Sequence, residues 1–149
     1  MITIEFFEIP IEEEVEKIAD LAAIAALEDV KADLSIAFCD NPYIQDLNAQ
    51  YRGIDRPTDV LSFSSEEINP ESGNRYLGDI VISLSQARSQ AETARNLLKS
   101  EVAMLVVHGI LHLRGYDHGD LQKKNEMWEK QASILLTMGI TMDKFSGDE

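Results

Sequence analysis

The sequence predicts an α/β (α+β) fold, with a small mixed sheet of four strands packed against about five helices. Runs rich in β-branched and aromatic residues, with apolar side chains at every second position, alternate with runs whose apolar residues recur at helical spacing. The predicted order is strand, helix, strand, helix, two strands and three helices. At 149 residues the chain has the length of one ordinary domain, so we expect residues 1–149 to share one hydrophobic core.

The first half of the chain contains two predicted strand and helix pairs. Alternation of apolar residues predicts a strand within residues 1–9 and another over residues 32–40. An apolar stripe predicts a helix over residues 10–28, with Pro10 in its first turn and glutamates near its positive end. Residues 41–51 predict a short helix after the second strand.

The second half predicts a pair of strands followed by three helices. The turn-rich segment 66–75 lies between the two strands and indicates that they are antiparallel, which makes the sheet mixed. Ser85 is a favourable cap for the first of the three helices. The expected elements are strands at 58–65 and 76–84, a helix from 85 to a break near 96–100, a second helix ending at 115, and a third over 120–138.

Composition restricts the class of protein. Cys39 is the only cysteine, so no intrachain disulfide can form and a reducing compartment, the cytoplasm, is expected. We expect a soluble chain without a signal peptide, because no apolar run approaches the roughly 18 residues of a membrane span. The formal charge is −14, but residues 1–50 hold 12 of the 27 acidic residues and only two of the 13 basic ones. The rest of the surface therefore remains compatible with an anionic partner.

The three histidines of the chain all lie in the stretch "HGILHLRGYDH". His108 and His112 are four residues apart on a predicted helix, so both side chains leave the same face of it. Gly115 can adopt a positive φ, end the helix and return His118 to the same point. The spacing favours three ligands to one metal ion over three hydrogen-bonded core histidines, and the fourth position is left to water, as in a catalytic zinc site.

Two further stretches, "YRGIDRPTDVLSF" and "LGDIVIS", accompany the histidine motif. Together the three closely resemble the YbeY family of metal-dependent endoribonucleases, in motif from about residue 48 to 118 and in element order over the whole chain. One departure is Ser64, where the family usually has proline. The resemblance implies an α/β fold whose histidine helix is similar to that of zinc hydrolases. It also implies that single-stranded RNA is the substrate.

The resemblance further implies a role in processing and maturing ribosomal RNA and in ribosome quality control, with small-subunit components as partners. The metal-binding histidines of the family fall on His108, His112 and His118, and its functional arginine falls on Arg52. One Zn²⁺ per chain is expected, although three imidazoles also suit nickel, copper or iron. The metal would activate water or polarise the phosphate, and the Arg52 guanidinium would bind phosphate oxygens.

Two alternatives remain open. Another zinc hydrolase is one, but Gly109 replaces the glutamate that follows the first histidine in zinc peptidases, and the lone Cys39 removes the cysteine ligands usual in nucleobase deaminases. The other is a non-catalytic ribosome assembly factor in which a structural metal holds the fold.

Overall fold

The computed structural model describes residues 1–141 and contains the expected four strands and five helices in the expected order. The strands are β1 (Ile2–Phe6), β2 (Ala32–Cys39), β3 (Val60–Ser64) and β4 (Arg75–Ser83). The helices are α1 (Glu13–Leu27), α2 (Asn41–Arg52), α3 (Leu84–Ala94), α4 (Leu98–Leu113) and α5 (Leu121–Thr137). The α+β fold class predicted from the sequence is therefore confirmed.

The four strands form one mixed sheet in the order β1-β2-β4-β3. β1 pairs parallel with β2, and β2 pairs parallel with β4. β3 pairs antiparallel with β4, with Val60 opposite Ile82, as the turn-rich segment between them predicts. β4 is the last strand in the chain, but it lies between β2 and β3 in the sheet. β4 is therefore a central strand, and β3 lies at an edge.

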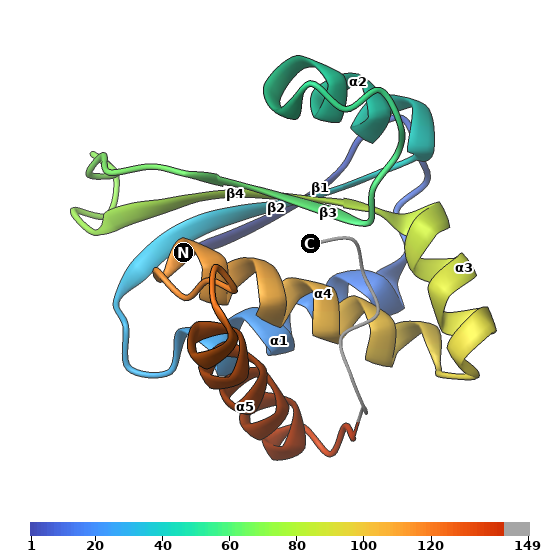
Figure 1. Cartoon of the computed structure of the whole chain (residues 1–149). Coiled ribbons are helices and arrows are strands. Elements are labelled where there is room, and N and C mark those ends of the chain that lie inside the picture. Colours follow the sequence, from blue (N-terminus) through green and yellow to red (C-terminus); the bar gives the residue numbers. More distant parts are fainter. Residues whose placement is uncertain (142–149) are drawn as a thin grey trace.

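Helices cover the two faces of the sheet unequally (Figure 1). α1 and α4 lie on one face of the sheet, α5 packs against both of them, and all three contribute to the larger core. α2 lies alone on the opposite face. There it closes a small second core made of Cys39, Ile44, Leu61 and Val81. The sheet thus separates the histidine-bearing α4 from α2.

α4 is the most deeply buried helix of the large core. Its side chains are buried without interruption from Glu101 to Leu111, because it packs against the sheet, α1, α3 and α5. This burial explains why its sequence is apolar on every side rather than on one stripe. Within residues 1–141, no helix combines the length and the apolar character needed to cross a membrane.

Two helix starts differ from the sequence predictions. α1 begins at Glu13 rather than at Pro10, because the chain is still non-helical there and Glu12 has an extended backbone. The fixed φ of proline suits an extended segment as well as a first helical turn, so it does not decide between them. α3 is capped by Ser83 instead of Ser85, since the Ser83 side chain accepts a hydrogen bond from the backbone N–H of Gln86.

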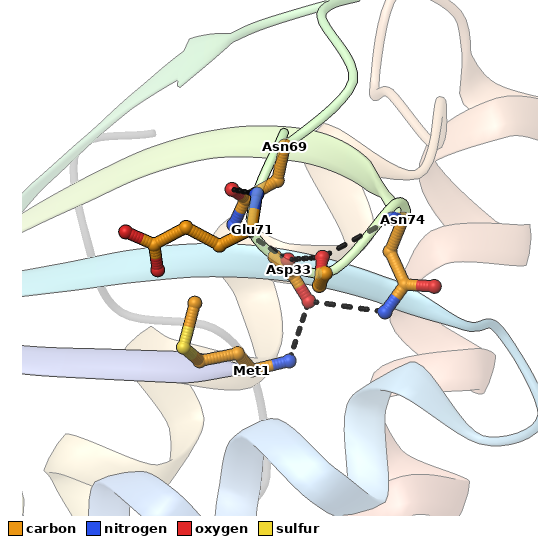
Figure 2. A network of polar contacts seen from close by, with 6 residues as sticks. Met1, Asp33, Asn69, Glu71 and Asn74 are labelled. Carbon is orange, nitrogen blue, oxygen red and sulfur yellow. Dashed lines mark hydrogen bonds and ion pairs between the residues drawn. The ribbon is translucent and has the colours of Figure 1, made fainter.

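A buried carboxylate joins the start of the sheet to the turn between β3 and β4 (Figure 2). Asp33, near the start of β2, is 1% exposed and accepts a hydrogen bond from the N-terminal ammonium of Met1. The Asn69 amide donates to it at 2.7 Å, and the Ser72 hydroxyl and the Asn74 amide also donate. The ammonium, followed by the hydroxyl, holds the pKa of Asp33 well below its usual range.

A pair of buried acids lies where α4 meets β3. Glu101 on α4 and Asp59, just before β3, are both 0% exposed, and the Gln90 amide of α3 donates to Asp59 at 3.2 Å. Burial raises the pKa of Glu101 to about 7, and the negative charge of Asp59 contributes to the rise. Near neutral pH, Glu101 therefore remains partly protonated in the folded protein.

Glu101→Gln is expected to stabilise the protein at pH 8 by about 3 kcal/mol, and at pH 5 by less than about 1 kcal/mol. The unfolded chain loses the Glu101 proton near pH 4.5, whereas the folded chain keeps it to about pH 7. Wild-type stability therefore falls as the pH rises through this window, and glutamine removes that loss. Urea unfolding at both pH values measures the difference. Exposed Glu92→Gln is the control, and an equal gain at both pH values would contradict the expectation.

Candidate metal centre

The three histidines converge at the end of α4. His108 and His112 project from the last turns of the helix, and His118 lies on the segment that leads to α5. His108 Nε2 and His112 Nε2 are 3.1 Å apart. One ring nitrogen from each of the three histidines lies within 4.8 Å of the corresponding nitrogens of the other two. The structure thus brings together the residues that the sequence spacing predicts to meet.

Local backbone geometry returns His118 to the helix end. Gly115 has φ +100°, in the region that favours glycine, and it follows the last turn of α4 directly. The backbone N–H of Tyr116 then donates to the carbonyl of Leu111 at 2.9 Å, which closes the helix end. The chain reverses over α4, and its next turn places His118 beside the two helical histidines. The predicted role of Gly115 is therefore confirmed.

The donor set fits a divalent transition metal. Two nitrogens that bind one tetrahedral zinc at about 2.0–2.1 Å stand about 3.3 Å apart, which is close to the separation of the His108 and His112 nitrogens. His108 is 3% exposed, His112 is half-buried and His118 is exposed. The cluster is thus fixed in the core on one side and reaches solvent on the other. Three histidines can hold a metal there and leave a position that faces solvent.

Electrostatics keep the two helical histidines neutral. Burial, followed by the neighbouring His112, lowers the pKa of His108 to about 3. Burial also lowers the pKa of His112, and His118 adds to the effect. Neutral imidazoles have a nitrogen lone pair available for a metal, so at neutral pH these ligands need not lose a proton first.

Gln131 on α5 is a contact of the site that the sequence analysis did not identify. Its side chain is 4% exposed, and its Oε1 lies 3.0 Å from His108 Nδ1. The one available signal was a polar residue between Met127 and Ile134 on the otherwise apolar core face of α5. Sequence alone does not say what that polar residue would face.

Comparison with known proteins identifies the family. The model of the endoribonuclease YbeY family matches residues 3–139. The chain belongs to the endoribonuclease YbeY family. It is 41% identical over 136 residues to endoribonuclease YbeY of Lysinibacillus sphaericus, covering 87% of each chain. It is 45% identical over 130 residues to endoribonuclease YbeY of Geobacillus kaustophilus, covering 81% of this chain and 83% of the relative.

A solved structure supports the same assignment. The solution structure of TM1509 from Thermotoga maritima superposes with a TM-score of 0.65 at 32% identity, covering 93% of this chain and 90% of that one. The fold of this YbeY family member is therefore shared by a solved protein over nearly its whole length. The family resemblance predicted from three short motifs is confirmed, together with the enzyme class that the family name carries.

Arg52, the arginine of the "YRG" motif of the YbeY family, lies on α2 rather than on α4. It is exposed, forms the last residue of α2, and α2 covers the face of the sheet opposite to α4 (Figure 1). Gly53 follows with φ +71° and ends the helix. The three-histidine cluster is formed by α4 and the segment after it, and the role of Arg52 in binding phosphate stays a prediction.

Two other polar residues near the histidines have local partners. Asp117 Oδ1 accepts a hydrogen bond from the backbone N–H of Gly119 at 2.8 Å, which stabilises the turn before α5. The Arg114 guanidinium donates to the Ala26 carbonyl and to Glu28, and so ties the end of α4 to the end of α1. These contacts give both residues a structural role.

Gly109 has a packing role that its place in the motif does not reveal. A Cβ at this position would lie 3.0–3.2 Å from three side-chain atoms of Ile80 on β4. The residue after His108 thus faces the sheet, whereas His108 and His112 face the cluster. Glycine allows α4 to approach β4 closely, and the position cannot present a side chain to a metal.

A groove lies on the α2 face of the sheet. It has a volume of about 520 Å³, and aromatic side chains including Tyr43, Tyr51 and Phe63 line it together with the carboxylates of Glu5 and Asp79. The two carboxylates disfavour a phosphate there. The histidine cluster, which brings three nitrogen donors together and reaches solvent at His118, is the better candidate for chemistry on a phosphodiester.

Proposed function

We propose that this chain is a zinc-dependent endoribonuclease that cleaves single-stranded RNA during ribosomal RNA processing and maturation. Membership of the endoribonuclease YbeY family supports the reaction class. The single observation that carries the metal dependence is the convergence of three histidine nitrogens within 4.8 Å. A role in ribosome quality control, contact with small-subunit components and a place in the cytoplasm belong to the same proposal.

His108, His112 and His118 would hold the metal, and each has a distinct position. His108 is fixed by the core, His112 borders the core, and exposed His118 closes the site from the solvent side. When bound, a divalent metal supplies a Lewis acid that lowers the pKa of water and offsets negative charge on a phosphate. Zinc is preferred because three imidazoles and an open position are typical of catalytic zinc.

Arg52 would bind RNA phosphate through its guanidinium, which can donate two parallel hydrogen bonds to phosphate oxygens. Its exposure at the end of α2 suits contact with a strand that extends beyond the histidines. The formal charge of −14 is compatible with this proposal but does not argue for it, because residues 51–149 hold 15 acidic and 11 basic residues.

Metal removal separates an enzyme from a protein that uses metal only to hold its fold. We expect chelation to abolish cleavage of a single-stranded RNA oligonucleotide and zinc to restore it, while the melting temperature falls by only a few degrees. The reason is that the large core consists of apolar side chains and includes none of the three histidines. Arg52→Ala at equal zinc loading should weaken cleavage and RNA binding but not zinc affinity. Two results would contradict the proposal. One is cleavage that continues without metal. The other is a protein that unfolds on chelation and that does not cleave RNA even when it is loaded with zinc.

A further inference from the structure

We propose that Gln131 is a positioning residue for the metal centre, acting through His108. The inference rests on the proposed metal site and concerns how this chain orients one of its ligands. Gln131 Oε1 accepts a hydrogen bond from His108 Nδ1–H, and this bond directs the Nε2 lone pair of His108 towards the other two histidines.

Because the side chains of Gln131 and His108 are both buried, water cannot replace either one as the hydrogen-bond partner of the other. Gln131 is 4% exposed and His108 is 3% exposed, so neither polar group can exchange this partner for bulk water. Buried polar atoms without a hydrogen bond are costly, by about 1–3 kcal/mol each. The 3.0 Å distance between Oε1 and Nδ1 is that of a good hydrogen bond.

The tautomer of His108 follows from this contact. A neutral imidazole carries one N–H donor and one acceptor nitrogen. Because an amide oxygen only accepts, the nitrogen that faces Gln131 must carry the proton, and Nε2 is left with its lone pair. Nε2 is also the nitrogen 3.1 Å from His112 Nε2. The hydrogen bond and the convergence of the histidines therefore require the same protonation state of His108.

Packing of α5 fixes the position of the amide. Met127, Ile134 and Leu135 are buried on the same face of α5 as Gln131, and they hold this face against the large core. The positioning group therefore comes from a helix other than the one that carries the histidines. Docking of α5 against α4 completes the orientation of His108.

Zinc affinity tests the role without any measurement of cleavage. Zinc dissociation constants are measured by competition with a chromophoric chelator for wild type, Gln131→Leu and Gln131→Glu. Leucine fills similar space but accepts no hydrogen bond, and we expect it to weaken zinc binding by about 10- to 100-fold. Glutamate still accepts the Nδ1–H, so it should keep most of the affinity. Gln122→Leu, on the exposed side of α5, is the matched control and should bind as wild type.

A spectroscopic readout distinguishes positioning from packing. In the metal-free protein, ¹⁵N-resolved NMR of the His108 ring should show the proton on Nδ1 in wild type and in Gln131→Glu. Gln131→Leu should lose this tautomer. Metal-free melting temperatures of the variants show whether each one is folded.

The outcomes separate this inference from the proposed function. If His112→Ala loses zinc but Gln131→Leu binds zinc as tightly as wild type and keeps the Nδ1 proton, the positioning role is wrong and the metal site stands. If His112→Ala also binds zinc as wild type does, the metal site itself is wrong, and the role of Gln131 is overturned with it.

Discussion

Replacing His112 with alanine is expected to slow cleavage of single-stranded RNA by at least about 100-fold at limiting zinc. Loss of a partner that only orients a metal ligand costs about 10–100-fold in metal affinity, and loss of a ligand itself costs at least as much. His112 is less buried than His108, so its replacement should disturb the core less than replacement of His108 would. Zinc affinity and cleavage of a labelled oligonucleotide are measured on the same samples.

Lys99→Ala is the matched control for His112→Ala, since Lys99 is exposed at the opposite end of α4. It should retain zinc affinity and cleavage. The metal-free melting temperature of His112→Ala should stay close to that of wild type, which separates loss of a ligand from loss of the fold. Cleavage by His112→Ala at the wild-type rate and at low zinc would show that the histidine cluster is not the active centre.

Gly78→Ala is expected to destabilise the protein by roughly 4 kcal/mol or more, which can prevent folding. Gly78 has φ +139°, and a Cβ there would lie 2.0 Å from the carbonyl oxygen of Phe63 on β3. Backbone strain of about 1–3 kcal/mol and overpacking of about 1–3 kcal/mol act together. The neighbour is a strand backbone, so it cannot relax by changing a rotamer. Urea unfolding measures the loss.

Gly73→Ala is the control for Gly78→Ala. Gly73 also has a positive φ, +77°, but a Cβ there would meet no heavy atom within 4 Å. It should lose only the cost of the backbone conformation, about 1–2 kcal/mol. If the two variants were equally stable, close approach of β3 to β4 would not be the reason for glycine in the "LGD" motif.

Sequence patterns were sufficient for the elements and for the histidines, because both depend on short-range geometry. Alternation identified the strands, and the four-residue spacing of His108 and His112 fixed their common face whatever the rest of the fold. The positive φ of Gly115 followed from its place after an apolar helix. Each of these features depends on residues close together in the sequence, so it could be predicted without knowing how the elements pack.

Features that depend on distant contacts were not predictable. The central place of β4 and the isolation of α2 on its own face are set by packing between segments far apart in the sequence. Gln131 is 23 residues from His108, and only the docking of α5 reveals what its amide faces. The same holds for Glu101, whose burial beside Asp59 has no signature in the residues around it.

The contact between Gly109 and Ile80 limits how this centre could be re-engineered. Zinc peptidases take a general base from the position that follows their first helical histidine, yet here that position is directed at the sheet. A glutamate grafted there would press a carboxylate into β4 and would not reach a substrate. Converting the scaffold to peptide hydrolysis would need a base supplied from another segment, so the scaffold resists that change through its packing rather than through its choice of metal ligands.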